Sequence, residues 1–538
     1  MSGWNIADIW EAVAGAQPGA PAVVQGGRRF TWAELDERAN GVAAALLAAP
    51  GVERQAKVAQ YLYNSPEYLE TLFAAWKAGL VPVNTNYRYT HDELVYLWDN
   101  ADAVAVVFHG AFTETIEGIR HRLPRIGLWL WVDDGTGPMP EWAEPYQAAA
   151  KAGGREPVLP PWGRSGDDLL MLYTGGTTGS PKGTMWRQDD LFVNLNAAAL
   201  PPYSLDGGLE QIAAERAERG PGPRAIPACP LMHGTALFIT IGLLTTGGSA
   251  ILLEKRGFDA TELFDVVEGE QANGVIIVGD AFARPMVKAL DEHPGRWDLS
   301  SLLLIYSSGV MWSEPVKEAL LAHHPDMILA DLLGSSEALG MGKSLSGGTT
   351  AATTATFQLS EDSVVLTDDN RVVQPGSSEI GRVALKGRVP VGYYKDPEKS
   401  ARTFPTIDGI RYTVPGDYAT VEADGSITLL GRGSVVINTG GEKVFPEEVE
   451  EAMKTFAGVR DAVAVGVPDD RFGEAVTGVV ELEPGATIDA GALREHVKRH
   501  LAAFKAPHNV VVVDTIGRAP NGKVDYRRLK ELAIERLT

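Results

Sequence analysis

The chain has 538 residues, of which 45% are hydrophobic and 22% charged, and its formal net charge is −22. Such a length exceeds one ordinary hydrophobic core, so we expect a large body and at least one further domain. The acidic balance, without a long run of basic residues, excludes the electrostatic footprint of a nucleic-acid-binding protein. The single cysteine, Cys229, excludes an intramolecular disulfide framework and a structural zinc site.

The first residues, Met1 to Asp8, have neither the basic stretch nor the apolar stretch of a secretory signal. Together with the lone cysteine, this predicts a cytosolic protein. Residues 236–253 are uncharged and about as long as a membrane-spanning helix needs to be. Their centre, Thr245 to Gly248, breaks a helix, so we expect two buried elements joined by a turn and no integral membrane segment.

Roughly the first 430 residues alternate short apolar runs with helical periodicity, which is typical of an α/β body with largely parallel, buried strands. After the first expected strand, a helix begins at Pro66 with Ser65 as its N-cap and stops at Gly79. Thr90 and Glu93 form a capping box that opens the next helix. The expected strands are residues 57–62, 103–108, 169–173, 275–278, 302–306 and 327–330.

Two later regions differ from this pattern. Residues 206–224 have glycine and proline at their ends around a charged, alanine-rich centre, which predicts a surface excursion with a short helix. Beyond about Gly431 the pattern changes to a smaller α+β unit of roughly a hundred residues, an ordinary domain size. Its expected elements are helices at residues 446–456, at 491–501 and from 525 onward, and strands at 462–467 and 509–513.

The strongest local signal is the segment Tyr173 to Gly183, YTGGTTGSPKG, which directly follows an expected strand. Its glycines let backbone N–H groups turn toward one ligand, its hydroxyls add donors and its lysine adds a positive charge, so we predict a phosphate-binding loop. The Walker A spacing does not fit the segment, which argues against a P-loop kinase or GTPase. A flexible linker is the alternative. The predicted phosphate contacts are Thr174, Gly175, Gly176, Thr177, Thr178, Gly179 and Lys182.

This loop closely resembles the signature of the adenylate-forming superfamily, which contains acyl-CoA synthetases, firefly luciferase and the adenylation domains of nonribosomal peptide synthetases. Further segments similar to the family's motifs follow in the family's order over nearly the whole chain. The resemblance implies ATP and Mg²⁺ as cofactors, coenzyme A as co-substrate and a small-molecule carboxylic acid as substrate. It also implies a large N-terminal multi-sheet α/β body (residues 1–431), a hinge (432–434) and a small mobile C-terminal α+β domain (435–538).

Residues 334–337, Gly-Ser-Ser-Glu, are similar to the family's aromatic-Gly-x-Thr-Glu segment. The resemblance implies that Glu337 holds Mg²⁺ on the ATP phosphates and that the hydroxyl of Ser336 faces the α-phosphate. A surface glutamate that caps a helix is the alternative. Leu333 replaces the family's aromatic residue, which should weaken adenine binding by about 0.5–1.5 kcal/mol through lost ring stacking.

Three short segments, Ser307-Ser-Gly, Gly416-Asp and Gly431-Arg, are turn signals when taken alone. They fall where the family binds the nucleotide, with Asp417 on the ribose hydroxyls and Arg432 on ribose or phosphate. By this resemblance, the ATP site also includes Ser308, Gly309, Gly334, Ser335, Asp417 and Arg432.

Residues 518–523, Arg-Ala-Pro-Asn-Gly-Lys, match the family's catalytic-lysine segment, although a lysine after Asn-Gly is usually a solvated turn residue. Lys523 would bridge the carboxylate and the α-phosphate, where two anions repel each other most. Ser434 stands at the hinge position, where the family commonly has aspartate or lysine. Gly440, Gly441, Glu442 and Lys443 resemble a loop that covers the site during the thiol step, with a plain strand-connecting turn as the alternative.

His233 lies in a segment that resembles the family's gate of the acyl pocket, although a structural histidine remains the alternative. Cys229 reads as a small buried residue, because Pro230 intervenes before His233 and no third group would orient a Cys-His pair. The predicted pocket residues are His233, Phe238, Gly279, Asp280, Ala281 and Ala338. Many of them are small, which favours a bulky apolar acid, and Asp280 is an unresolved exception.

The segments that begin at Met185 and Pro230 are similar to actinobacterial acyl-CoA synthetases for steroid side-chain or polycyclic terpenoid acids. The predicted function is therefore an ATP-dependent carboxylic acid:CoA ligase that forms acyl-AMP and then acyl-CoA from a steroid, terpenoid or fatty acid. Three alternatives stay open: a ligase that loads a carrier protein, a luciferase-like oxygenase, and an inactive nucleotide-binding protein. A homodimer is also left open.

Overall fold

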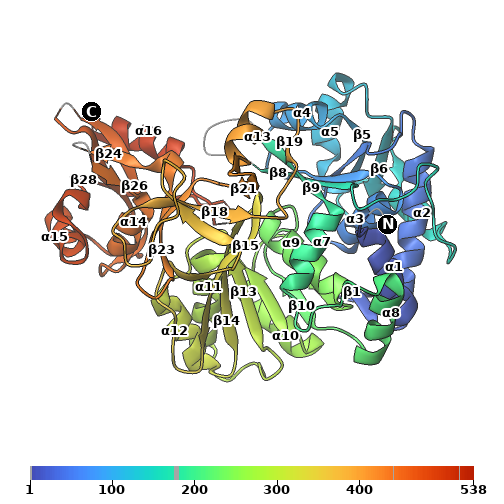
Figure 1. The fold of residues 1–538 in the computed structure, drawn as a ribbon, viewed down its shortest axis with the longest axis horizontal. Coiled ribbons are helices and arrows are strands. Elements are labelled where there is room, and N and C mark those ends of the chain that lie inside the picture. The colour runs from blue at the N-terminus through green and yellow to red at the C-terminus, as the bar shows by residue number, and fades with distance from the viewer. Residues whose placement is uncertain (1–2, 175–180, 440–441, 470, 520–521, 538) are drawn as a thin grey trace.

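The computed structural model describes residues 3–174, 181–439, 442–469, 471–519 and 522–537. In Figure 1 the chain forms a large body and a smaller domain at its C-terminal end. The large body contains a 15-stranded and an 8-stranded sheet, and the small domain contains a 5-stranded sheet. This arrangement confirms the predicted fold class, a large N-terminal α/β body followed by a smaller α+β domain.

The 8-stranded sheet has the order β19-β9-β8-β4-β3-β5-β6-β7. Its strands are β3 (Lys57–Tyr61), β4 (Val81–Asn84), β5 (Ala103–His109), β6 (Leu128–Val132), β7 (Glu144–Pro145), β8 (Leu169–Thr174), β9 (Lys182–Arg187) and β19 (Gly392–Tyr393). The strands from β8 through β4 and β3 to β7 pair in parallel, whereas β9 runs antiparallel to β8 and β19 antiparallel to β9. The hairpin β8–β9 therefore stands at one edge region of this sheet.

Helices cover this sheet and the other large sheet. They are α1 (Ile6–Ala16), α2 (Trp32–Ala48), α3 (Pro66–Lys77), α4 (His91–Asn100), α5 (Thr113–Ile119), α6 (Tyr146–Lys151), α7 (Gln188–Ala197), α10 (Ala260–Glu270), α11 (Gly279–Glu292), α12 (Glu314–His323) and α13 (Pro397–Thr403). Helix α3 begins after Ser65 as expected, but it is buried on every side rather than on one face. Its charged residues are paired there, as in the Arg38–Glu70 bridge of 2.6 Å.

The 15-stranded sheet changes from parallel to antiparallel pairing after β14 (Ile328–Ser335), which forms a hairpin with β15 (Ala338–Gly347). Its first part contains β1 (Pro21–Gln25), β2 (Arg28–Thr31), β10 (Arg224–Pro227), β11 (Ser249–Leu252), β12 (Gly274–Ile277) and β13 (Leu304–Ser308). The later part contains β16 (Thr356–Leu359), β17 (Ser363–Leu366), β18 (Gly381–Lys386), β20 (Thr406–Ile407), β21 (Ile410–Thr413), β22 (Asp417–Val421) and β23 (Ile427–Arg432). Strands β13 and β14 extend further than expected, so Ser308 and Ser335 are strand residues.

Residues 236–253 form the predicted pair of buried elements, most of helix α9 (Gly234–Thr245) and strand β11, with a turn between them. Across the described residues, no helix combines the length and the hydropathy that a membrane crossing requires. The surface excursion at residues 206–224 holds the expected short helix, α8 (Gly208–Arg219), and it contacts α1.

The small domain contains the predicted helices and a strand that the sequence analysis did not identify, β27 (Gly473–Leu482). This strand is central, because it pairs with β24, β26 and β28. The other elements are β24 (Ile437–Thr439), β25 (Glu442–Val444), α14 (Pro446–Lys454), β26 (Val459–Asp469), α15 (Ala490–His500), β28 (Asn509–Val513) and α16 (Tyr526–Leu537).

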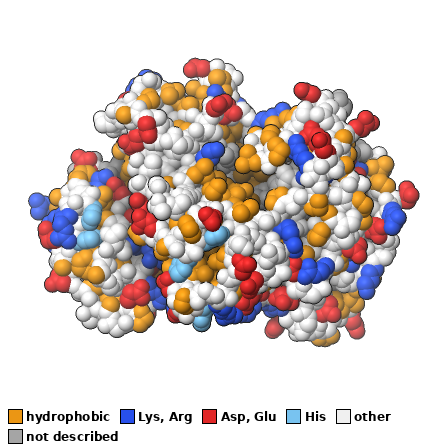
Figure 2. Space-filling model, turned by 90° about the horizontal axis from the view of Figure 1, so that it is seen from below, with side chains coloured by type: hydrophobic (Ala, Val, Ile, Leu, Met, Phe, Trp, Pro, Cys, Tyr) orange, Lys and Arg blue, Asp and Glu red, His pale blue; other side chains and the backbone are white. Residues whose placement is uncertain are grey.

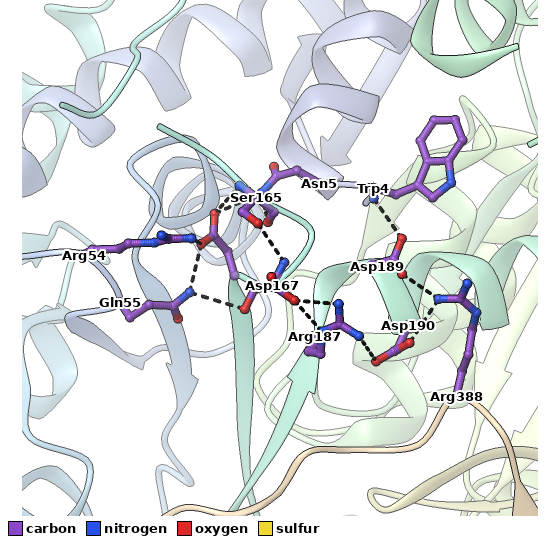
Figure 3. Close-up of polar contacts among 11 residues, drawn as sticks. Trp4, Asn5, Arg54, Gln55, Ser165, Asp167, Arg187, Asp189, Asp190 and Arg388 are labelled. Atoms are coloured by element: carbon purple, nitrogen blue, oxygen red, sulfur yellow. Dashed lines mark hydrogen bonds and ion pairs between the residues drawn. The ribbon is translucent and has the colours of Figure 1, made fainter. Parts of the chain in front are cut away.

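A network of polar contacts fastens the base of the β8–β9 hairpin (Figure 3). Asp167 and Asp168, which immediately precede β8, accept hydrogen bonds from Arg187 at the end of β9 and from Arg54, respectively. Arg388 then pairs with both Asp189 and Asp190, at 2.5 and 3.0 Å, at the start of α7. These contacts hold the start of β8 and the end of β9, the two strands that flank the predicted phosphate loop.

A buried ion pair joins α12 to β14. Lys317 on α12 and Asp331 on β14 are 1% and 4% exposed, and Nζ of the lysine lies 3.6 Å from Oδ2 of the aspartate. Burial raises the pKa of Asp331 to about 7, and the charge of Lys317 partly offsets this rise. Removing one member of such a pair leaves the other unpaired, whereas replacing both with apolar residues restores a dry contact.

We therefore expect Lys317→Met to lower the free energy of unfolding by about 3–5 kcal/mol. The double variant Lys317→Met/Asp331→Leu should recover most of this loss, because no buried charge is left without a partner. The shifts in thermal midpoint of Lys317→Met, of Asp331→Leu and of the double variant measure this coupling. Additive shifts would contradict the expectation.

Candidate active site

The β8–β9 hairpin brings the two ends of the predicted phosphate loop together, with Thr174 paired opposite Lys182. The residues Gly175, Gly176, Thr177, Thr178 and Gly179 lie outside the described part of the chain. Nζ of Lys182 lies 2.9 Å from Oδ2 of Asp396, the N-cap residue of α13. The lysine charge is therefore held beside the mouth of the hairpin by one carboxylate.

Glu337 lies in the tight turn between β14 and β15 and not at the start of a helix. Its Oε1 accepts a hydrogen bond of 2.8 Å from the phenol of Tyr393. The indole of Trp186 on β9 donates a 2.8 Å hydrogen bond to the carbonyl of Ser336, so the turn is tied to the β9 edge of the other sheet. The backbone N–H of Glu337 also donates to the hydroxyl of Ser335 at 3.2 Å.

The predicted adenine-side residues lie on neighbouring strands. Ser308 at the end of β13 is paired with β14, and Gly309 follows it with a φ of +92°, a conformation that suits glycine. Gly334 lies near the end of β14. Leu333 is only 7% exposed and belongs to a core cluster with Ala338, which is fully buried. Ala338 thus packs into the core in this structure, and its part in the acyl pocket stays a prediction.

Asp417 and Arg432 face each other across strands β22 and β23. The guanidinium Nε donates to Oδ1 of the aspartate at 3.2 Å, and this carboxylate raises the pKa of Arg432 above its usual range. The backbone N–H of Arg432 donates to Oε1 of Glu447 at the start of α14, at 3.3 Å. The residues predicted to bind ribose and phosphate therefore lie together where the large body passes into the small domain.

Lys523 is brought into this region by the segment before α16. Its side chain is exposed, and the residue before it, Gly522, lies close to Val310 and Ala281 of the large body. Loss of hydration lowers the pKa of Lys523, the charge of Arg432 lowers it further, and Glu337 and Asp417 act in the opposite direction. The charges of Glu337, Asp417 and Arg432 thus act on Lys523, and the part of these residues in adenylation stays a prediction.

Arg518 anchors the segment that carries the lysine. Its Nε and Nη2 bind both oxygens of Asp461 at 2.6 and 2.9 Å, and its Nη1 donates to the carbonyl of Gly522 at 3.1 Å. Such a bidentate pair fixes a guanidinium in direction as well as in distance. The turn before Lys523 is thereby attached to the sheet of the small domain.

His233 precedes α9 as its N-cap residue. Burial, together with the charges of Lys523 and Arg88, lowers the pKa of His233 to about 3. The imidazole is therefore neutral near pH 7, and its gating role stays a prediction. Burial raises the pKa of the Cys229 thiol to about 12, so this cysteine is an inert core residue, as expected.

The structure accounts for Asp280, the exception among the predicted pocket residues. Its carboxylate accepts hydrogen bonds from the hydroxyl of Ser313 at 2.8 Å and from Arg284 at 3.1 Å. No ligand ammonium is needed to balance it. Gly279 has a φ of +50°, and a Cβ there would lie 2.4 Å from the carbonyl oxygen of Met311.

A cavity of about 620 Å³ opens between the two domains. Asp280 and Ala281 line its wall in the large body, and Arg460 and Arg518 line its wall in the small domain. Phe238 is buried on α9, with its ring 6.1 Å from that of Trp186. Seen from below in Figure 2, the surface is hollowed near its middle, and hydrophobic side chains gather around the hollow.

The predicted thiol-step loop belongs to the β24–β25 hairpin, which places Glu442 in β25. Gly440 and Gly441 lie outside the described residues, as do the side chains of Ser434 and Lys443. The backbone of Ser434 forms part of a short 3-10 turn, Gly433–Val435, directly after Arg432. The roles of this loop and of the hinge stay predictions.

Sequence reasoning missed Tyr393 and Asp396, which contact the two predicted phosphate-site residues Glu337 and Lys182. The only available signal was Asp396-Pro397, an N-cap followed by proline at the first helical position. It marks a helix start, but it does not indicate which strands the preceding tyrosine lies against.

Residues 10–394 match the family described as AMP-binding enzyme, and residues 448–523 match the AMP-binding enzyme C-terminal domain. The chain belongs to the AMP-binding enzyme family. This membership confirms the resemblance to adenylate-forming enzymes, whose CoA ligases use ATP and coenzyme A.

Two relatives are similar to the chain over nearly its whole length. The medium/long-chain-fatty-acid–CoA/3-oxocholest-4-en-26-oate–CoA ligase of Mycolicibacterium smegmatis is 39% identical and covers 99% of this chain and 97% of its own. The 3-oxocholest-4-en-26-oate–CoA ligase of Rhodococcus rhodochrous is also 39% identical, over 98% and 95%.

Solved structures share the fold of this AMP-binding enzyme. The anthranilate CoA ligase AuaEII in complex with anthranoyl-AMP has a TM-score of 0.84 at 20% identity and covers 100% of this chain and 98% of its own. ATP-bound MatB from Rhodopseudomonas palustris has a TM-score of 0.80 at 25% identity, over 98% and 100%. The first likeness concerns the fold alone.

We expect Lys523→Ala to slow adenylation by roughly 10²–10³-fold, because a cation aimed at the reacting anions is removed. The protonated form is the active one, so adenylation should be present below the lowered pKa of Lys523 and lost above it. The alkaline limb should therefore lie below 10.5, the ordinary lysine value.

The measurement is the initial rate of acid-dependent pyrophosphate release across the alkaline range. Lys523→Arg is the matched variant, since a guanidinium stays protonated and should remove this limb even where the rate is low. Wild-type adenylation by Lys523→Ala would contradict the assignment.

Proposed function

We propose that this AMP-binding enzyme is an ATP-dependent carboxylic acid:CoA ligase that forms acyl-AMP and then acyl-CoA. The observation that carries the proposal is that Arg432 donates to Asp417 at 3.2 Å where the two domains meet, and that the charges of both residues and of Glu337 act on Lys523. Two cations and two carboxylates at this position fit a nucleotide whose phosphate reacts and whose ribose is held. Similarity to CoA ligases along the whole chain supports the same activity.

In the first half-reaction, the substrate carboxylate attacks the α-phosphorus of ATP and pyrophosphate leaves. Asp417 would hold the ribose, and Lys182 and Arg432 would hold phosphate oxygens. Lys523 would stabilise the charge that builds up between carboxylate and phosphate. Because His233 is neutral, it would line the acyl side without competing for that charge.

Glu337 is the residue that would hold Mg²⁺. Mg²⁺ sites on nucleotides commonly use one or two carboxylates together with the phosphates, and a single carboxylate in a fixed turn fits that pattern. The ion would supply positive charge to the departing pyrophosphate. The chain's own part is to hold the carboxylate of Glu337 at the phosphate side.

In the second half-reaction, the CoA thiol attacks the acyl-AMP carbonyl and AMP leaves. We propose that the small domain, residues 435–538, rotates about residues 432–434, so that Lys523 withdraws and the loop at residues 440–443 approaches. The 3-10 turn at Gly433–Val435 is a short connection that can absorb such a rotation.

For the acid, we propose a bulky hydrophobic substrate, either a steroid side-chain acid or a medium- to long-chain fatty acid. The names of both relatives support the steroid acid, and the name of the Mycolicibacterium relative also supports the fatty acid. The internal pairing of Asp280 removes the reason to expect an amino acid. A polycyclic terpenoid acid stays a further prediction. A carrier-protein acceptor remains the alternative to test.

We expect Mg·ATP, CoA and a steroid or long-chain acid to yield pyrophosphate and a thioester, identified by mass, at a higher kcat/KM than acetate or benzoate. Pyrophosphate with acyl-AMP but no CoA thioester would favour a carrier protein, tested with holo carrier protein. Light emission or oxygen consumption would instead favour the oxygenase. Absence of pyrophosphate with every acid class would overturn the ligase proposal.

A further inference from the structure

One short segment, residues 388–396, touches both sides of the proposed triphosphate site. It supplies the phenol of Tyr393 to Glu337 and the carboxylate of Asp396 to Lys182. Glu337 lies in the turn of the 15-stranded sheet and Lys182 at the start of β9 in the 8-stranded sheet. The segment therefore bridges groups from two separate sheets.

We propose that Tyr393 is a positioning residue that fixes the carboxylate of Glu337 for metal-nucleotide binding. This inference rests on the proposed function, because it concerns the carboxylate that would hold Mg²⁺. A carboxylate on a surface turn samples several rotamers, and each must be frozen when a metal binds. A hydrogen bond to one oxygen removes part of that freedom beforehand and still leaves lone pairs for a cation.

The tyrosine is itself rigidly placed. Its strand β19 pairs with β9, and its backbone N–H donates to the hydroxyl of Ser400 at 2.8 Å. The ring is 7% exposed and packs against Phe404, with 5.5 Å between centroids.

The residues on either side of Tyr393 are anchored as well. Arg388 is held by Asp189 and Asp190 in the network of Figure 3. Beyond it, the phenol of Tyr394 donates to Oδ2 of Asp102 at 2.8 Å, and Lys395 pairs with the same carboxylate at 2.7 Å. Tyr393 thus projects from a segment fixed on both sides, which is what a group that orients another side chain requires.

Tyr393→Phe removes only the hydroxyl and keeps the packed ring. The matched control is Tyr394→Phe, which removes the hydroxyl of the neighbouring tyrosine. That hydroxyl donates to Asp102 instead of Glu337. We expect Tyr393→Phe to weaken Mn²⁺ binding, measured by electron paramagnetic resonance with α,β-methylene-ATP present, by about 10-fold. The free Mg²⁺ that half-saturates pyrophosphate release should rise by a similar factor, and Tyr394→Phe should leave both values unchanged.

Two further measurements separate positioning from a general loss of structure. Thioester formation from preformed acyl-AMP and CoA needs no metal-bound triphosphate, so it should stay at the wild-type rate in Tyr393→Phe. In a Glu337→Gln background, Tyr393→Phe should weaken Mn²⁺ binding little further, because both changes remove the same interaction.

Wild-type Mn²⁺ binding by Tyr393→Phe, or an equal loss in both half-reactions, would overturn the role of Tyr393 and leave the ligase proposal intact. Wild-type protein that binds the Mn²⁺-nucleotide complex but releases no pyrophosphate with any acid would instead overturn the ligase proposal. Failure of the wild type to bind the complex would overturn both.

Discussion

The hydrogen bond from the indole of Trp186 to the carbonyl of Ser336 joins the two sheets of the large body where the predicted phosphate-binding groups meet. One sheet supplies Lys182 and the other supplies Glu337, and neither sheet alone holds both. A shift of the β9 edge relative to the β14–β15 turn by even one ångström would spread the charges apart, and such misplacement is costly in catalysis. The part-buried hydrogen bonds from Trp186 to Ser336 and from Tyr393 to Glu337 both lie at this junction.

The predicted active site also requires that the two domains meet. Asp417 and Arg432 come from adjacent strands of the large body, whereas Lys523 arrives from the small domain on a turn held by Arg518. Glu447 touches the backbone of Arg432, and burial, together with the neighbouring charge of Glu450, raises the pKa of Glu447 to about 8. The domain junction thus combines the predicted nucleotide-binding residues with a carboxyl whose neutral form is favoured by burial.

Much of the fold followed from local patterns. A helix end depends mainly on near neighbours in the sequence. The capping residue Thr90 and the helix-breaking residues 245–248 therefore allowed the sequence alone to predict where the adjacent helices begin or end. The strand β27 was missed because its acidic and glycine residues interrupt the apolar run, and only its pairing with three other strands explains its burial. The buried pair of Lys317 and Asp331 and the bond from Tyr393 to Glu337 also depend on side chains from separate elements. No spacing within the sequence encodes such contacts.

Gly522 connects the choice of acid to the delivery of the lysine. It has a φ of +71°, and a Cβ at this position would lie 3.1 Å from Cγ2 of Val310 and 3.3 Å from Cβ of Ala281. The backbone that precedes Lys523 therefore rests directly on a wall that also borders the predicted acyl pocket. A larger residue at position 281 would first contact the backbone at Gly522, before it changed the shape of the predicted acyl pocket. Evolution or engineering of a new acid preference has more freedom on the far walls of the pocket than on this shared one.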